Sequence, residues 1–143
     1  MKVIMQNKTP LDNSMNNGLF FLSLGGIGEI GANCYLYGCD GKWLMIDLGL
    51  SFADEQYPGV DLLLPKIDFI ESLGDNLEAV IISHGHEDHA GAISYFSNKI
   101  NCPVYATQFS KLLIENRLKE FGKIEQLNLI EMNFKNKIEL INF

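Results

Sequence analysis

His84-Gly85-His86-Glu87-Asp88-His89 is the stretch of sequence on which the fold and the chemistry of this chain depend. It follows Ala79-Val80-Ile81-Ile82-Ser83, an apolar run of the length of a buried strand. All three histidines of the chain lie in it, and His84 and His86 share one face at the exit of the strand because they are two residues apart. The stretch therefore gathers potential metal ligands at one turn between a strand and a helix.

The residue types at this turn are those that bind zinc. Zinc takes imidazole nitrogen and carboxylate oxygen, and a catalytic zinc keeps a position open for water. Two neighbouring metals could be served, one by His84 and His86 and the other by Asp88 and His89, about 3.5–4 Å apart and sharing a hydroxide. A packing role would leave costly polar groups without partners. We expect Glu87 to be solvated, and the ligand set suits zinc or manganese.

Outward from this turn, short strands separated by glycine turns give way to alternating strands and helices. The patterns predict one α/β (α+β) unit over 18–143, a mixed β-sheet flanked by helices, after a flexible N-terminus at 1–17. The buried face of the last helix is expected to carry Phe109, Leu113, Leu118 and Phe121. The predicted strands are 19–24, 33–37, 43–46, 79–83, 103–106 and 137–143, and the predicted helices are 65–73, 88–96 and 107–121.

Composition and charge narrow the class of protein. The chain has 143 residues, 47% of them hydrophobic and 20% charged, which is ordinary for a soluble domain. A net charge of −7 argues against a bulk electrostatic hold on nucleic acid, although Lys111, Arg117, Lys119 and Lys123 could form a local basic patch. The three scattered cysteines indicate free thiols in a reducing cytosol. No signal peptide or membrane span is recognisable, so a cytoplasmic protein is expected.

Four stretches carry a resemblance to a known family. His84-Gly85-His86-Glu87-Asp88-His89 resembles the H-x-H-x-D-H motif of the metallo-β-lactamase superfamily. Leu24-Gly25-Gly26-Ile27-Gly28-Glu29-Ile30-Gly31-Ala32-Asn33 resembles the first loop of the ribonuclease J family, which belongs to the β-CASP group of that superfamily. Ile46-Asp47-Leu48-Gly49-Leu50 and Pro103-Val104-Tyr105-Ala106-Thr107 are similar to the same family. The resemblance runs from about Leu19 to the C-terminus.

The resemblance implies a fold, a reaction and a role for each residue. The fold would be the N-terminal part of a four-layer αββα sandwich. His84 and His86 would bind the first of two zinc ions, and Asp88 and His89 the second, with manganese as the alternative. Asp88 would also orient or deprotonate the attacking water, as the catalytic residue. Asp47 would hold a ligating histidine from behind; its alternative is a plain turn former at a strand end. The substrate would be single-stranded RNA, cleaved at a phosphodiester by exo- or endonucleolytic hydrolysis.

The family pattern requires more than this chain contains. Ribonuclease J-like enzymes use a further histidine, a bridging aspartate, a final histidine and an inserted β-CASP domain, and no histidine follows His89. The chain is therefore expected to be a truncated portion of the domain, inactive alone, with an exposed sheet surface that favours self-association. It would be completed by a complementary C-terminal half or by homo-oligomerisation. The alternative is a non-catalytic remnant, or half of a split protein, that binds a partner.

A dinucleotide-binding module is a further alternative. Gly26-Ile27-Gly28-Glu29-Ile30-Gly31 matches G-x-G-x-x-G after a strand, and Asp47 lies where a ribose-binding acid is expected. That module would need a helix over about 28–40, where Tyr35-Leu36-Tyr37 is poor helix material. It would also leave the histidine cluster unexplained.

Overall fold

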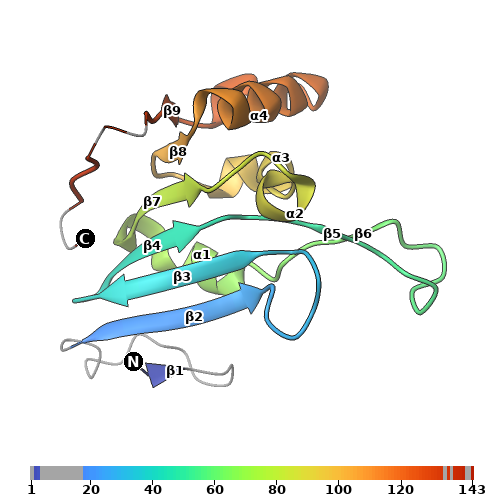
Figure 1. The fold of residues 1–143 in the computed structure, drawn as a ribbon, viewed down its shortest axis with the longest axis horizontal. Helices are drawn as coiled ribbons and strands as arrows, with labels where there is room; N and C mark the ends of the chain where they lie inside the picture. The colour runs from blue at the N-terminus through green and yellow to red at the C-terminus, as the bar shows by residue number, and fades with distance from the viewer. Residues whose placement is uncertain (1, 4–17, 134, 136, 141–142) are drawn as a thin grey trace.

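The computed structural model describes residues 2–3, 18–133, 135, 137–140 and 143 (Figure 1). Its strands are β1 (Lys2–Val3), β2 (Leu19–Gly25), β3 (Cys34–Cys39), β4 (Lys42–Ile46), β5 (Ser51–Phe52), β6 (Leu62–Leu63), β7 (Leu77–Ile82), β8 (Val104–Ala106) and β9 (Leu129–Glu131). Its α-helices are α1 (Asp68–Leu73), α2 (Glu87–Ala90), α3 (Ile93–Phe96) and α4 (Gln108–Glu120). Short 3₁₀ turns are Gly74–Asn76, Ser97–Lys99 and Ile124–Gln126.

One mixed sheet organises the described part of the chain. Seven strands follow the order β1-β2-β3-β4-β7-β8-β9, and β5 pairs with β6 separately. The β2–β3 and β3–β4 pairs are antiparallel, whereas β4, β7, β8 and β9 run parallel (Figure 1). Asp40 and Gly41 close the β3–β4 hairpin with φ of 47° and 80°, as a tight two-residue turn requires. The expected mixed α/β architecture is confirmed.

The helices pack on one face of this sheet because alternate side chains of each strand are apolar and buried. Trp43 of β4 meets Phe69 of α1 edge-on, with ring centroids 5.1 Å apart. One continuous core joins the inner face of the strands to the helices. Its members include Phe20, Leu22, Leu36, Met45, Val80, Ile82 and Val104 from strands, and Ile70, Ile93, Ile114 and Leu118 from helices.

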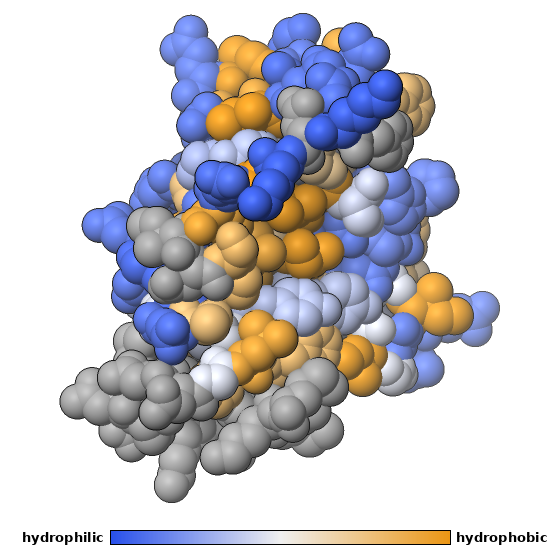
Figure 2. Space-filling model, turned by 60° about the vertical axis from the view of Figure 1, so that its left-hand side comes forward, coloured by the Kyte–Doolittle hydropathy of each residue, from blue (hydrophilic) through white to orange (hydrophobic). Residues whose placement is uncertain are grey.

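The opposite face of the sheet is apolar but only half-buried. Strand register aligns Tyr35 with Ile46, Ile46 with Ile81, Ile81 with Tyr105 and Tyr105 with Ile130, so one row crosses five strands. Figure 2 shows apolar side chains (orange) gathered in the middle of the molecule with hydrophilic residues around them. We call the row Tyr35, Ile46, Ile81, Tyr105 and Ile130 the open face.

The helix expected over 88–96 is divided into α2 and α3. The Ala92 N–H donates to the Leu48 carbonyl at 3.1 Å, a partner from outside the helix. The helical ladder therefore breaks at this point, even though Gly91 and Ala92 keep helical dihedral angles. The turn after β4 thus decides where α2 ends.

The buried face of α4 differs from the prediction. Ser110, Ile114 and Leu118 are buried, whereas Phe109 is 71% exposed and Leu113 and Phe121 lie at the surface. Only Leu118 of the expected stripe is in the core. The small Ser110 lets the helix approach the histidine turn, since its Cα would lie 3.4 Å from a Cβ at Gly85.

The last strand is also misplaced by the prediction. The sheet continues with β9, which pairs in parallel with β8, while residues 137–140 form no strand. The rest of the predicted strand falls partly on residues 141–142, outside the described residues.

The proposed flexible N-terminus falls mostly on residues 4–17, which also lie outside the described part. Lys2–Val3 pair in parallel with Phe20–Phe21. Where a dinucleotide-binding module needs a helix, the chain forms β3, so that alternative is excluded. Among the described helices, none is long and apolar enough to cross a membrane.

Candidate metal centre

Two neighbouring parallel strands bring the first residues of the site together. Because β4 and β7 run parallel, their carboxyl ends meet at one edge of the sheet. The Asp47 N–H donates to the Ile81 carbonyl at 2.9 Å. Ser83 is the first residue after β7. Asp47 has a φ of 62°, a conformation that aspartate tolerates better than most residues. The turn at Asp47 places its carboxylate in contact with Ser83 and His89.

Asp47 is the buried acceptor of the site, with only 3% of its surface exposed. Its Oδ1 accepts the Ser83 N–H at 2.7 Å, and its Oδ2 accepts the Ser83 hydroxyl at 2.8 Å. The Nδ1 of His89 lies 2.8 Å from the same Oδ2. A carboxylate can only accept, so His89 carries its proton on Nδ1 and presents a lone pair on Nε2.

His84 and His86 follow β7 two residues apart, and we call them the first donor pair, meaning a pair of side chains that could donate lone pairs to one metal ion. The Ser83 hydroxyl is committed to Asp47, so His84 Nδ1, 3.0 Å from Ser83 Oγ, donates to it. His84 therefore presents Nε2, which lies 3.1 Å from His86 Nδ1. The ring centroids of these two histidines are 4.5 Å apart.

The second donor pair, Asp88 and His89, comes from the first turn of α2. Asp88 Oδ2 lies 3.3 Å from His89 Nε2. The His84 and His89 ring centroids are 4.0 Å apart, so the two pairs adjoin each other. The structure thus brings His84, His86, Asp88, His89 and Asp47 together at one end of the sheet.

The spacing of the donors fits two half-built metal sites. Two ligands of one tetrahedral zinc, at about 2.0–2.1 Å each, lie about 3.3 Å from each other. The separations of 3.1 Å and 3.3 Å within the two pairs match that value. Within the described residues, no three His, Cys, Asp or Glu side chains form a complete metal-holding group. Each metal would therefore need further ligands.

Among the described residues, no cysteine joins the histidines and acids in a metal-holding group. Burial, and secondarily the negative charge of Asp47, raises the pKa of the Cys34 thiol to about 12. Burial raises the pKa of Cys102 to about 11. In the metal-free chain both groups are therefore neutral thiols near neutral pH.

Backbone contacts clamp the turn after β4 against α2. The Leu48 N–H donates to the His89 carbonyl at 2.8 Å, and the Leu50 N–H donates to the Glu87 carbonyl at 3.0 Å. Gly49 lies between them, and a Cβ there would overlap the Asp88 carbonyl. A side chain at position 49 is therefore incompatible with this packing.

Glu87 faces away from the donor pairs. Its carboxylate forms an ion pair with Arg117 of α4, so it is not simply solvated. Lys111, in turn, lies 3.8 Å from Glu115 in an i,i+4 pair. The basic residues of α4 are thus partly neutralised by acidic neighbours, which argues against a strong basic patch.

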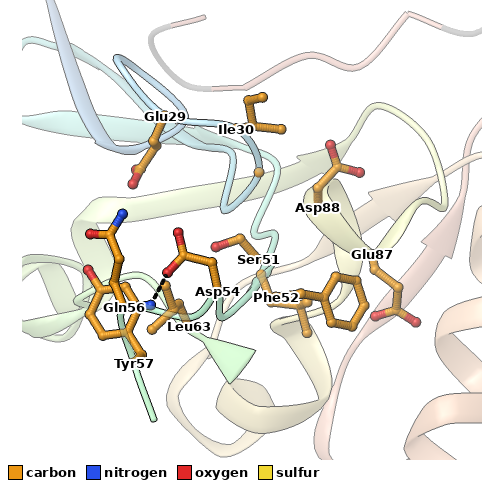
Figure 3. A pocket seen from close by; sticks show the side chains of 12 residues that line it. Glu29, Ile30, Ser51, Phe52, Asp54, Gln56, Tyr57, Leu63, Glu87 and Asp88 are labelled. Carbon is orange, nitrogen blue, oxygen red and sulfur yellow. Dashed lines mark hydrogen bonds between the residues drawn. The ribbon is translucent and has the colours of Figure 1, made fainter. Parts of the chain in front are cut away.

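An open cavity of about 660 Å³ adjoins Asp88 (Figure 3). Its wall includes the acids Glu29, Asp54 and Asp88 and the aromatic residues Phe52 and Tyr57. Figure 3 shows these side chains, which come from the glycine loop, from β5 and the loop after it, and from α2. None of its described lining residues is basic, so the cavity suits a neutral or hydrogen-bond-donating group better than an anion.

Two residues at the centre were missed by sequence reasoning. Ser83 joins Asp47 to His84, and Asn33 places its amide against Asp88 and His89. The position of Ser83 directly before His84 is a weak signal for its role. Asn33 stands more than 50 residues away, and only the tertiary structure brings it here.

Comparison with known proteins gives a consistent picture. Residues 27–135 match the model of the family described as "Metallo-beta-lactamase superfamily". A "Ribonuclease J" of Sinorhizobium meliloti is 44% identical over 108 residues, covering 73% of this chain and 19% of that protein. A "Ribonuclease J2" of Bacillus subtilis is 32% identical over 117 residues, covering 82% and 21%. A "Ribonuclease J" of Synechocystis is 30% identical over 129 residues, covering 90% and 20%. The chain spans about a fifth of these relatives' length.

Proposed function

The chain belongs to the metallo-β-lactamase superfamily, which is metal-dependent, and from this premise we propose that it carries part of a ribonuclease J-like site for hydrolysing RNA phosphodiesters. The observation that carries the proposal is the pair of donor groups at zinc-ligand spacing. The similarity to ribonuclease J proteins supports the choice of RNA as substrate.

Each residue of the centre has a role in this proposal. His84 and His86 would hold one zinc ion, and Asp88 and His89 the other, with manganese as the alternative. Zinc bound there supplies Lewis-acid stabilisation of phosphate charge and lowers the pKa of water. Asp88, with one carboxylate oxygen left free, orients the attacking water and takes up its proton. Asp47 keeps His89 in the tautomer that presents Nε2.

The cavity beside Asp88 gives the substrate a place to lie. Single-stranded RNA can splay its bases onto aromatic side chains, and Phe52 and Tyr57 offer such surfaces. Carboxylates accept hydrogen bonds from base amino groups, whereas they repel phosphates. We place a base of the RNA in this cavity and the scissile phosphate beside the donor pairs.

The missing ligands come, in this proposal, from a complementary C-terminal segment or from a second copy of the chain. The test combines the chain with the segment of the Sinorhizobium meliloti relative that follows its matched region. We expect no cleavage of labelled single-stranded RNA by the chain alone and cleavage, with about two zinc ions per assembly, by the combination. Substituting His86→Ala should abolish both. Cleavage that is insensitive to this substitution or to a chelator would refute the proposal, and end-labelled products distinguish exo- from endonucleolytic attack.

A second candidate function is partner binding without catalysis. The open face is an apolar surface that a complementary sheet could cover. Tight binding of the complementary segment by the His86→Ala variant, with no RNA cleavage by either form, would favour this function. We also propose a cytoplasmic location, which the three free cysteines support.

A further inference from the structure

Asn33 lies against the second donor pair. Its Nδ2 donates to the Asp88 carbonyl at 2.9 Å. The same nitrogen lies 3.3 Å from Asp88 Oδ2 and 3.2 Å from His89 Nε2. An amide nitrogen carries two hydrogens. One is donated to the Asp88 carbonyl, and the other is shared between two acceptors, Asp88 Oδ2 and His89 Nε2.

The geometry gives the second hydrogen a specific place. His89 gives its own proton to Asp47, so its Nε2 can only accept. Asp88 Oδ2 is likewise an acceptor. Asn33 Nδ2 therefore holds together the two lone pairs that a metal ion would take, which stand 3.3 Å apart.

Tyr35 and Gly26 set the orientation of this amide. The Tyr35 hydroxyl lies 2.8 Å from Asn33 Oδ1 and 3.2 Å from the Gly26 carbonyl, and its single hydrogen is shared between these two oxygens, with the shorter contact to Asn33. The contact orients the Asn33 oxygen toward Tyr35 and its nitrogen toward Asp88. A Cβ at Gly26 would overlap both the Tyr35 hydroxyl and Asn33 Oδ1, so only glycine fits there.

The main chain of Asn33 is held as firmly as its side chain. Its N–H donates to the Asp88 carbonyl and its own carbonyl accepts the Gly49 N–H, both at 2.9 Å. The glycine loop, β3, the turn after β4 and α2 therefore meet at this one residue. These contacts make up a continuous relay of Gly26, Tyr35, Asn33 and the second donor pair.

We propose that Asn33, oriented by Tyr35, is the positioning residue of the second metal site and that its amide stands in for the cation in the metal-free chain. It keeps Asp88 Oδ2 and His89 Nε2 at ligand spacing until a metal ion displaces the shared hydrogen. The inference rests on the proposed function only in taking Asp88 and His89 as metal ligands. In this proposal the glycine loop, through Gly26, also helps to orient Tyr35 and Asn33.

The experiment uses Tyr35→Phe, which removes one hydroxyl from the relay. Tyr37→Phe is the matched control, since it removes the same group from the same strand and the same face. In the metal-free chain, nitrogen-15 spectra should show His89 protonated on Nδ1 in both variants. Exchange of the Asn33 side-chain amide hydrogens should be about fivefold faster in Tyr35→Phe than in the control, as expected for a lost hydrogen bond.

Zinc titration supplies the second readout. The zinc affinity of Tyr35→Phe should fall by about tenfold, as is typical when a group behind a ligand is removed, and that of Tyr37→Phe should not. Asn33→Ala should lose the slow-exchanging amide and, provided its thermal melt stays cooperative, at least as much affinity. Equal amide exchange in Tyr35→Phe and Tyr37→Phe overturns the proposal. Because this spectrum contains neither metal nor RNA, its outcome is independent of whether RNA is cleaved.

Discussion

Asp47 determines which nitrogen His84 and His89 present to a metal. It accepts from His89 directly and takes the Ser83 hydroxyl, which leaves His84 to donate to Ser83. One buried carboxylate thus sets the tautomers of two histidines without touching a metal. A histidine ligand depends on such a partner because the hydrogen bond at one ring nitrogen fixes the lone pair at the other.

We predict that Asp47→Asn weakens zinc binding by about tenfold or more, since an amide cannot accept from all three of these donors. Asparagine also tolerates the positive φ of this position, so the backbone should keep its course. Asp54→Asn, an identical change at an exposed site, is the control. Zinc competition with a chromophoric chelator measures the effect, and equal affinities of the two variants would contradict the assigned role.

The contact between the turn after β4 and α2 is the element that assembles the centre. Three backbone hydrogen bonds join Leu48 and Leu50 to Glu87, His89 and Ala92. These bonds accompany the end of α2 at Ala90 and hold His89 where its Nδ1 reaches Asp47. Gly49 makes the close approach possible and has no positive φ to complicate a substitution.

Gly49→Ala is predicted to lower the free energy of unfolding by about 3 kcal/mol or more, because its Cβ would overlap the backbone of Asp88. Gly85→Ala is the matched comparison. Its Cβ would lie 2.6 Å from Leu113 Cδ1, the movable end of a side chain, so the cost should be about 1 kcal/mol. Urea unfolding of both variants measures the difference. Equal losses of unfolding free energy in the two variants would contradict the prediction, because they would show that the turn at Gly49 can move to accommodate a Cβ.

At the scale of the whole molecule, the sheet has one covered face and one open face. Helices bury the first, while the open face carries five half-buried apolar or aromatic residues. Contiguous apolar surface of this kind favours association between molecules. Strands β3, β4 and β7 carry apolar side chains on both faces: one set packs in the core, and the other set lies on the open face.

We predict that the chain self-associates and that Ile81→Lys at the centre of the open face suppresses association. A charge there remains solvated in the monomer but is costly to bury between two sheets. Asn116→Lys, an identical charge placed on the exposed side of α4, is the control. Sedimentation velocity over a concentration series measures the change. A monomeric parent chain, or equal association of both variants, would contradict this prediction.

The stability of the whole molecule should also fall at alkaline pH. The fold raises the thiol pKa of Cys34 from 9.0 to about 12 and that of Cys102 from 9.0 to about 11. Because the folded pKa exceeds the unfolded one, the contribution is complete below pH 9 and is lost progressively as the pH rises from 9 toward the folded pKa values of about 11 and about 12. Each thiol adds a slope of up to about 1.4 kcal/mol per pH unit in this window.

Urea unfolding between pH 8 and pH 11 measures this loss. Cys34→Ala should reduce the slope, whereas Cys39→Ser, at a half-buried site, should leave it nearly as it is. A slope that is the same in all three proteins would show that other groups are responsible.

The sequence by itself determined the features that depend on local spacing. The alternation of apolar residues located β2, β3, β4, β7 and β8, and the spacing of the histidines and Asp88 placed four donors at one turn. A strand fixes which residues share a face, and a turn brings near neighbours together, whatever surrounds them. The mixed sheet and the superfamily follow from these local patterns.

The tertiary structure alone decided how the donors are held and where several elements end. Asn33 reaches Asp88 across 55 positions and Asp47 reaches His89 across 42. The Leu48 carbonyl accepts the hydrogen bond at which α2 ends, and Ser110 replaces Phe109 on the buried side of α4. The sheet ends with β9, whereas the strand predicted over 137–143 does not form over 137–140. Local propensity leaves such choices nearly equal in energy. Hydrogen-bond partners and close packing between distant segments decide them, and these exist only once the chain has folded.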